Sequence, residues 1–352
     1  MMVSDAREAP IKASHPTELS HFAPSSSAGA PGSAPDSESA PETAPTPASP
    51  ATPEGFRSGF VCLCGRPNAG KSTLINSVLE RKLLITSNVA QTTRHRFRAV
   101  LDSRDYQLIL VDTPGIHKPE DLLGKELNST ATKALADVDA IAWVLDSSVP
   151  FGRGDRWLAD LLGSSQLPKI LVLNKTDAAS DAEVEAHREA ACSLLEFTDV
   201  VALSALKQRN IADFISAAVC QLPPGPRWFP FGTASDQPLE VIIAEFIREK
   251  VLLNTFAEVP HAVGVTVGSL EFLPKRGLYR IGANLHVERE SQKGIIVGRG
   301  GEQLRRIGSA ARVDLEHFLG ARVYLDLRVK LRKNWRRDLS SIHRFGYGEG
   351  LR

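Results

Sequence analysis

Short apolar runs separated by mixed stretches dominate the chain from Gly59 onward. They lie at Phe60–Cys64, Leu108–Val111, Ala140–Leu145, Ile170–Leu173 and Val200–Leu203. Continuous apolar runs of this length are typical of parallel strands buried on both faces, and stretches of helical length separate most of them. The pattern predicts an α/β domain with a mostly parallel sheet.

The pattern changes after the break Pro223-Pro224-Gly225-Pro226. Beyond it we expect, in order, helix Leu239–Leu253, strand Val263–Glu271, strand Tyr279–Glu290, a glycine-rich turn, helix Glu302–Leu319 and strand Ala321–Lys330. This predicts a second, smaller α+β domain. We therefore place the first domain at residues 56–222, a linker at 223–238 and the second domain at 239–352.

The first 55 residues have a different composition. They hold 10 of the 22 prolines among Ala, Ser, Thr and acidic residues, so they have too little apolar surface to offset the entropy of ordering. We expect a disordered tail. It lacks the apolar core of a secretory signal and the Arg-rich, acid-poor character of a mitochondrial presequence.

The net charge is informative only when it is counted separately for each segment of the chain. The whole chain carries +1, which read alone argues against nucleic-acid binding, but residues 1–55 carry −5, residues 56–230 carry 0 and residues 231–352 carry +6. A basic C-terminal domain suits a polyanionic partner. The longest apolar runs are far shorter than the roughly 20 residues of a membrane-spanning helix.

The four cysteines are Cys62, Cys64, Cys192 and Cys220. Cys62 and Cys64 are two apart in a predicted strand and face the same side of the sheet. A metal or redox pair is one interpretation; because no further ligand stands nearby, we favour buried apolar side chains. Four unclustered cysteines fit a reducing cytosol.

A phosphate-binding motif follows the first strand. The sequence GxxxxGK[ST] is formed by Gly65, Arg66, Pro67, Asn68, Ala69, Gly70, Lys71 and Ser72, and Thr73 follows in the helix that we expect to begin at Ser72. Glycines let backbone N–H groups turn toward phosphate oxygens, Lys71 reaches the β- and γ-phosphates, and the Ser72 hydroxyl binds Mg²⁺. The alternative is a glycine turn beside a chance lysine.

Three further segments close predicted strands at the same sheet edge. In Asp112-Thr113-Pro114-Gly115, Asp112 can hold Mg²⁺ through water and the Gly115 N–H can contact the γ-phosphate. In Asn174-Lys175-Thr176-Asp177, the Asp177 carboxylate suits the two donors of guanine and not adenine. In Ser204-Ala205-Leu206, a backbone N–H can bond guanine O6. Together these segments predict a GTP site.

The set GRPNAGKS, DTPG, NKTD and SAL resembles translation-factor-class GTPases of the TrmE–Era group. By this resemblance, Gln91-Thr92-Thr93-Arg94 looks like switch I, with Mg²⁺ on one of the two threonines; we favour Thr93. The implied metal ligands are Ser72, Thr93 and Asp112, and the implied catalytic residues are Lys71, Thr93, Asp112 and Gly115.

Ile116 stands where Ras-type GTPases place the glutamine that orients the attacking water. Since isoleucine offers no hydrogen bond, we expect slow intrinsic hydrolysis. Asn68 resembles the residue that binds K⁺ in some relatives; it is equally a turn-former that satisfies local backbone.

The basic domain contains a second glycine loop. Gly298, Arg299, Gly300 and Gly301 form GxxG, the loop that clamps a nucleic-acid backbone in KH domains, and Arg305 and Arg306 follow in the next helix. Glycines allow phosphates to approach the main chain closely. The predicted order of helices and strands is that of a type II KH domain.

This half resembles the Era family at Asp236-Gln237-Pro238, at residues 245–250, at residues 258–261 and from Val329 to Gly348. The resemblance implies a monomeric GTP switch whose KH domain grips the 3′ end of 16S ribosomal RNA during maturation of the 30S subunit, in a bacterial cytoplasm with loose membrane contact. Two alternatives stay open. One is a membrane-associated signalling GTPase, and the other is an RNA scaffold that binds GTP with negligible turnover.

Overall fold

The computed structural model describes residues 52–87, 89, 92–115 and 121–347. The expected disordered tail lies almost wholly outside these ranges, as do Gln91 and Ile116 of the candidate site. Among the residues that are described, no helix combines the length and apolar character needed to cross a membrane.

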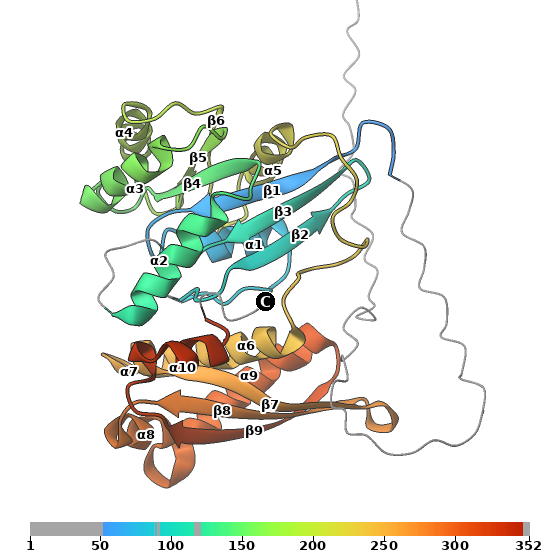
Figure 1. The fold of residues 1–352 in the computed structure, drawn as a ribbon, viewed down its shortest axis with the longest axis vertical. Helices are drawn as coiled ribbons and strands as arrows, with labels where there is room; N and C mark the ends of the chain where they lie inside the picture. Colours follow the sequence, from blue (N-terminus) through green and yellow to red (C-terminus); the bar gives the residue numbers. More distant parts are fainter. Residues whose placement is uncertain (1–51, 88, 90–91, 116–120, 348–352) are drawn as a thin grey trace, which may run out of the picture. The chain divides into compact units, whose positions relative to one another are not determined.

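Six strands form the sheet of the first domain, in the order β2-β3-β1-β4-β5-β6 (Figure 1). The apolar runs correctly predict the five parallel ones: β1 (Arg57–Cys64), β3 (Tyr106–Asp112), β4 (Ala140–Asp146), β5 (Lys169–Asn174) and β6 (Asp199–Ala202). The edge strand β2 (Phe97–Asp102) runs antiparallel to β3. Its apolar residues are interrupted by Arg98, so it does not stand out as an apolar run.

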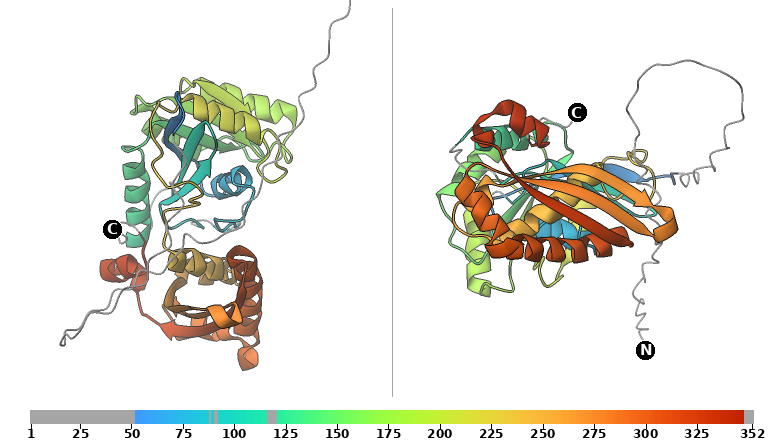
Figure 2. Two further views of the ribbon diagram at one scale, coloured as in Figure 1. Left: turned by 90° about the vertical axis from the view of Figure 1, so that its right-hand side faces the viewer. Right: turned by 90° about the horizontal axis from the view of Figure 1, so that it is seen from below.

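Helices cover both faces of this sheet (Figures 1 and 2). α1 (Lys71–Val78) and α5 (Ile211–Cys220) pack together on one face. α2 (Leu122–Ala134), α3 (Arg153–Gly163) and α4 (Asp181–Cys192) contribute to one apolar core on the other, around the fully buried Trp143 of β4. The mostly parallel α/β prediction is confirmed.

The same core contains the cysteine pair. Cys62 and Cys64 are both fully buried, with their sulfur atoms 3.7 Å apart. This confirms that they face one side of the sheet as apolar side chains.

Strand register brings the motifs to one edge. Leu63 near the end of β1 pairs with Asp112 at the end of β3, and Asp146 of β4 pairs with Asn174 at the end of β5. In open parallel sheets, ligands bind at this carboxyl edge.

The second domain has a three-stranded sheet in the order β7-β8-β9. Its elements are α6 (Leu239–Asn254), α7 (Val259–Ala262), β7 (Gly264–Leu273), β8 (Leu278–Val287), α8 (Glu290–Val297), α9 (Glu302–Leu319), β9 (Arg322–Leu331) and α10 (Leu339–Arg344). β8 is antiparallel to β7 and parallel to β9.

One prediction in this domain is wrong. The strand expected to reach Glu290 ends at Val287, and helix α8 occupies most of the stretch expected to be a glycine-rich turn. The Gln292 side chain accepts hydrogen bonds from the amides of Glu288 (3.0 Å) and Arg289 (3.1 Å), which ends the strand and begins the helix.

The segment expected to be a linker lies along the first sheet. The Ser58 amide donates to Pro223 O (3.1 Å) and the Val100 amide to Ala234 O (3.0 Å). At the other end of the chain, a cluster of apolar side chains joins Trp335, Ile342, Phe345 and Tyr347 to Leu123 and Leu127 of α2. The boundaries 56–222, 223–238 and 239–352 stay predictions.

Candidate functional site

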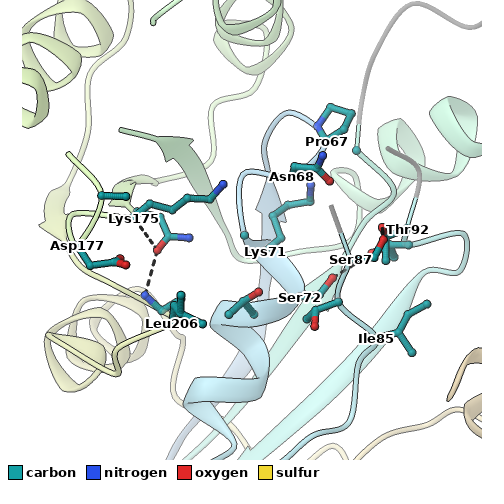
Figure 3. Close-up of a pocket in the computed structure, with 18 of the residues that line it drawn as sticks. Pro67, Asn68, Lys71, Ser72, Ile85, Ser87, Thr92, Lys175, Asp177 and Leu206 are labelled. Atoms are coloured by element: carbon teal, nitrogen blue, oxygen red, sulfur yellow. Dashed lines mark hydrogen bonds between the residues drawn. The ribbon is translucent and has the colours of Figure 1, made fainter. Parts of the chain in front are cut away.

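The phosphate loop connects β1 to α1, which begins one residue earlier than predicted, at Lys71. Gly70 has φ 95°, and a Cβ at this position would lie 2.3 Å from Asn174 Nδ2, so the loop requires glycine there. The Lys71 ammonium donates to the carbonyls of Gly65 (3.1 Å) and Arg66 (3.3 Å). The loop is thus wrapped around a cation, with Asn68 and Pro67 beside it (Figure 3).

Three oxygen-bearing side chains meet beside Lys71. Ser72 Oγ donates to Asp112 Oδ2 (2.7 Å), Thr93 Oγ1 donates to the same oxygen (3.0 Å), and the two hydroxyls lie 3.0 Å apart. Asp112 Oδ1 is buried and, within the described residues, has no hydrogen-bond partner. Hard oxygen ligands around one carboxylate fit Mg²⁺, which usually binds one or two carboxylates together with substrate phosphates.

The neighbouring threonine, Thr92, has different hydrogen-bond partners. Thr92 Oγ1 donates to Val89 O (2.6 Å) and lies 2.6 Å from Ser87 Oγ. The geometry therefore brings Thr93, and not Thr92, to Ser72 and Asp112. Metal binding by these three residues stays a prediction.

Burial affects the charges of this group. Burial lowers the pKa of Lys71, and the facing Asp112 opposes that shift. Burial likewise raises the pKa of Asp112, opposed by Lys71 and by the hydroxyls of Ser72 and Thr93. The ionised forms of Lys71 and Asp112 are both poorly solvated in this buried site. This favours a polyphosphate beside Lys71 and a cation beside Asp112 as ligands.

The opposite end of the site is built around Asn174. Its Nδ2 donates to Ala69 O (2.9 Å), and its Oδ1 accepts from the amides of Lys175 (2.8 Å) and Ala205 (3.1 Å). Asn174 thus joins the phosphate loop to the two predicted base-binding segments. The Ala205 amide, one of the candidates for guanine O6, is bonded to Asn174 in this structure.

Asp177 is held in place by the neighbouring segment. Its Oδ1 accepts a hydrogen bond from Ser204 Oγ at 2.5 Å. The Lys175 ammonium reaches Asp146 Oδ2 at 2.5 Å, so its alkyl chain crosses the site. Figure 3 shows Lys175, Asp177 and Leu206 on the side of the cavity opposite the phosphate loop.

A cavity of about 440 Å³ connects the two ends. The predicted residues that line it are Pro67, Asn68, Gly70, Lys71, Ser72, Thr73, Thr92, Thr93, Gly115, Asn174, Lys175, Asp177, Ala205 and Leu206. A cavity of this size is typical of small-ligand sites.

Other predicted residues shape the loops around this cavity. Arg66 is not one of the lining residues and pairs with Asp155 of α3 at 2.9 Å. Thr113 Oγ1 donates to Leu63 O (2.9 Å), which fixes the turn after β3. A Cβ on Gly115 would lie 2.9 Å from Pro67 Cα, so glycine permits this turn to approach the phosphate loop.

The sequence does not reveal some lining residues. Ile85, Thr86, Ser87 and Ala178 also line the cavity, as does Leu253 from α6 of the second domain. The run of small polar residues before Thr92 is a weak signal for Thr86 and Ser87. No local pattern marks Leu253, because only the tertiary fold brings it to the cavity.

The glycine loop of the second domain has the conformation that its composition suggests. Gly298, Gly300 and Gly301 have φ of 72°, 57° and 79°. A Cβ on Gly298 would lie 2.7 Å from Gln303 Cβ. The loop leads directly into α9, so the N-terminal amides of that helix are beside it.

A groove of about 440 Å³ follows this loop, between α9 and β9. It contains Gly301 and Arg305, whereas Arg306 is exposed outside it. The sequence does not single out Gly308 and Arg312 of α9 or Tyr324 of β9, which line it too. Exposed arginines, a tyrosine and open backbone are suited to a single-stranded nucleic acid.

Comparison with known proteins agrees with this geometry. A family model described as "50S ribosome-binding GTPase" matches residues 60–175, and a KH-domain model matches residues 258–336. The fold is similar to a crystal structure of Aquifex aeolicus Era bound to GDP·AlF4⁻, with 34% identity, a TM-score of 0.80, and coverage of 83% of this chain and 100% of that one. It is equally similar, at 34% identity and TM-score 0.80, to Era in complex with MgGDPNP and nucleotides 1506–1542 of 16S ribosomal RNA, covering 83% of this chain and 99% of that one.

Proposed function

Since the chain belongs to the Era family of GTPases, we propose that it is a GTP-binding and GTP-hydrolysing switch that binds the 3′ end of 16S ribosomal RNA and assists maturation of the small ribosomal subunit. The observation that best supports this is the convergence of Ser72, Thr93 and Asp112 within 3.0 Å of one another at one end of the nucleotide cavity. Thr93 lies in the segment that resembles switch I, so its place beside the other two depends on nucleotide state.

Different residues bind the phosphates, the base and the metal ion of Mg²⁺–GTP in this proposal. The loop amides and Lys71 bind the phosphates, and Asp177, oriented by Ser204, accepts the two guanine donors. Ser72, Thr93 and Asp112 would hold Mg²⁺, which supplies charge neutralisation of the β- and γ-phosphates when bound. Through its hydrogen bonds, Asn174 keeps the phosphate loop and the base-binding segment at a fixed separation.

The second domain supplies the RNA site. Gly298, Arg299, Gly300 and Gly301 approach the RNA backbone, and Arg305 neutralises phosphate along the groove. The relative in complex with nucleotides 1506–1542 of 16S ribosomal RNA supports this choice of partner. We expect Arg306, which is exposed outside the groove, to contribute general electrostatic attraction.

Slow turnover and K⁺ stimulation are further parts of the proposal. Ile116, which lies outside the described residues, replaces the water-orienting glutamine, and Asn68 lines the cavity beside the phosphate loop. A cation beside Asn68 would stabilise the charge that develops during hydrolysis. Faster GTP turnover in KCl than in NaCl of equal ionic strength supports this role, and equal rates reject it.

The nucleotide assignment is tested by Lys71→Ala. Removing the ammonium should abolish binding in a titration with fluorescent GDP and should abolish GTP turnover, while leaving the affinity for a 16S 3′-end RNA fragment unchanged without nucleotide. Arg188→Ala, which removes an exposed side chain of α4, is the control and should change none of the three. Unchanged GDP affinity in Lys71→Ala would reject the phosphate site.

The second candidate function is an RNA scaffold that binds GTP with negligible turnover, and the presence of Ile116 favours it. Single-turnover hydrolysis by the full chain, measured with and without 30S RNA, distinguishes this scaffold from a GTP-hydrolysing switch. We expect RNA to accelerate the reaction. An undetectable rate under both conditions would make the protein a GTP-binding RNA scaffold.

Peripheral membrane contact and a cytoplasmic location also belong to the proposal. The basic run at Lys330, Arg332, Lys333, Arg336 and Arg337 is suited to RNA phosphates or to acidic lipid. Binding to anionic vesicles that RNA competes away would indicate a shared surface.

A further inference from the structure

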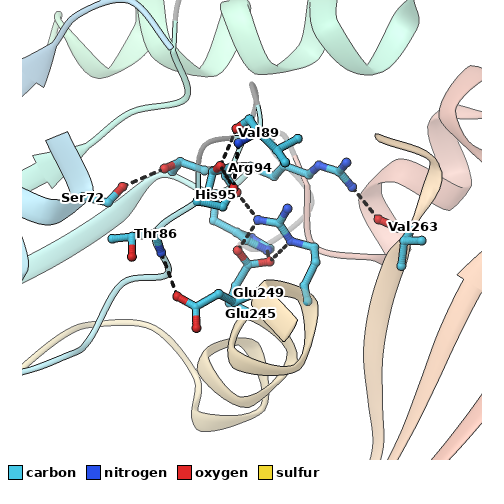
Figure 4. Close-up of polar contacts among 12 residues, drawn as sticks. Ser72, Thr86, Val89, Arg94, His95, Glu245, Glu249 and Val263 are labelled. Carbon is cyan, nitrogen blue, oxygen red and sulfur yellow. Dashed lines mark hydrogen bonds and ion pairs between the residues drawn. The ribbon is translucent and has the colours of Figure 1, made fainter. Parts of the chain in front are cut away.

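Two adjacent residues of α6 contact the chain at Thr86, which precedes the switch I motif, and at Thr92 within it (Figure 4). Glu249 Oε1 accepts from the Thr86 amide at 2.9 Å, and Arg248 Nη2 donates to the carbonyl of Thr92. The segment between these contacts leads directly to Thr93. A helix of the RNA-binding domain therefore contacts the chain at Thr86 and at Thr92, the residue before Thr93 of the predicted metal site.

Arg248 is held rigidly for this contact. Its side chain is fully buried, and its Nε and Nη2 donate to the two carboxylate oxygens of Glu245 at 2.8 and 2.6 Å. Burial would raise the pKa of Glu245, but Arg248 and His95 hold it well below its usual range. The pair thus stays ionised, and the planar guanidinium keeps one direction for the Thr92 carbonyl.

Arg94, which follows Thr93 in the chain, is also fixed by hydrogen bonds to the second domain. Its guanidinium is buried and donates to the carbonyls of Val263 (2.7 Å) and His261 (3.0 Å) in the second domain. The guanidinium also lies over the rings of Trp335 and Tyr347, at 5.8 and 5.3 Å from their centroids. Thr93 is flanked on both sides by groups fixed in the RNA-binding domain.

The contact at Glu249 leads on to the RNA groove. Lys82 and Lys250 both pair with Glu249, and both reach Asp314 of α9, at 2.6 and 2.5 Å. α9 starts at the glycine loop and lines the groove with Arg305 and Arg312. Ion pairs, and the hydrogen bond from the Thr86 amide to Glu249, therefore connect the helix that lines the groove to the chain shortly before switch I.

We propose that Arg248 is a positioning residue for the metal-binding Thr93, and that the RNA-binding domain thereby completes the GTP-bound form of the nucleotide site. The inference rests on the proposed function, because it assumes that Thr93 serves the γ-phosphate and its metal. A loop residue needs such support, since a ligand displaced by about 1 Å can cost on the order of a hundredfold in rate.

The first test is Arg248→Lys in the full chain. Lysine keeps the charge opposite Glu245 but cannot bind both carboxylate oxygens and the Thr92 carbonyl in one plane. We expect kcat for GTP to fall about tenfold, the effect of one lost charge-assisted hydrogen bond, with GDP affinity within about twofold of the parent. Arg98→Lys is the matched control, because Arg98 is a partly buried arginine of β2 that pairs with Asp236 at 3.0 Å.

A double-mutant cycle with Thr93→Ala distinguishes positioning from general stability. If Arg248 acts through Thr93, Arg248→Lys should lower kcat in the parent and have no further effect in Thr93→Ala. Equal losses in both backgrounds, or no loss in either, would overturn the inference. If Thr93→Ala itself leaves kcat unchanged, the proposed metal site is wrong instead.

A second variant tests the inference independently, in case Arg248→Lys fails to fold. Glu249→Ala removes the acceptor of the Thr86 amide at the other end of the segment, and the same cycle applies to it. We expect its effect on kcat to disappear in Thr93→Ala as well. An effect that persists there would contradict the inference by an independent route.

Discussion

Asp177 is the residue on which the choice of nucleotide depends most directly. It lines the cavity and is oriented by Ser204 Oγ at 2.5 Å. A carboxylate only accepts hydrogen bonds, so it matches the two adjacent donors of guanine. The identity of this residue was readable from the motif, but its orientation depends on a partner 27 positions away.

Asp177→Asn should exchange guanine for xanthine specificity. Two hydrogen bonds to a charged acceptor contribute about 1.5–3 kcal/mol each, so GTP affinity should fall by about 10²–10⁴-fold while xanthosine triphosphate gains affinity. Competition against fluorescent GDP measures both. Asp181→Asn is the control, because Asp181 is exposed at the start of α4; retained GTP preference in Asp177→Asn would count against the assignment.

Thr93 shows the limit of prediction at this scale. The motif offers two adjacent threonines, and local sequence does not distinguish them. The structure separates them by their partners: Thr93 meets Ser72 and Asp112, whereas Thr92 bonds Val89 and Ser87. The direction of each side chain depends on how Arg94 and Arg248 hold the backbone on either side.

Elements were predictable where the pattern is strong. The parallel strands are continuous apolar runs, and α9 matches its expected bounds of Glu302–Leu319. β2 and α8 were not predictable, for different reasons. β2 is an edge strand whose short apolar run is interrupted by Arg98, and α8 begins through a side-chain cap by Gln292 that periodicity does not reveal.

Gly298 tests the loop between α8 and α9. Gly298→Asp places a Cβ against Gln303 at a positive φ and adds a negative charge where RNA phosphates approach. We expect affinity for the 16S 3′-end fragment to fall at least tenfold, with GTP turnover in the absence of RNA unchanged. Gly294→Asp is the control: it adds the same charge four residues earlier, in α8, where a Cβ meets no atom within 4 Å. Equal losses in both variants would point to charge alone and against close backbone approach.

His286 of β8 gives the RNA-binding domain a pH dependence. Burial, with Arg332 and Lys330 nearby, lowers the pKa of this imidazole to about 4. The unfolded chain binds the proton more readily than the folded one, so stability should be full above the unfolded value near 6.5 and fall as pH drops toward 4. Thermal unfolding of His286→Gln should show a weaker pH dependence between those values than the parent; an unchanged profile would exclude this residue as the cause.

At the scale of the whole molecule, the net charge of +1 combines a −5 tail, a neutral nucleotide domain and a +6 RNA-binding domain. The two domain types were predictable because each has a motif in a short stretch of sequence. The contacts between the domains were not predictable, since Arg94 reaches Val263 across 169 positions and Arg248 reaches Thr92 across 156 positions. Contacts of that separation leave no local pattern, although they join the RNA-binding domain to the residues on either side of Thr93.

The central claim is that nucleotide state and RNA binding are coupled. Linkage requires that GTP strengthen RNA binding by the same factor by which RNA strengthens GTP binding. The most direct measurement is the affinity of the full chain for the 16S 3′-end fragment with a non-hydrolysable GTP analogue and with GDP, at fixed salt. We predict at least about fivefold tighter binding with the analogue, a difference that Arg248→Lys reduces. Equal affinity in the two nucleotide states would contradict the account.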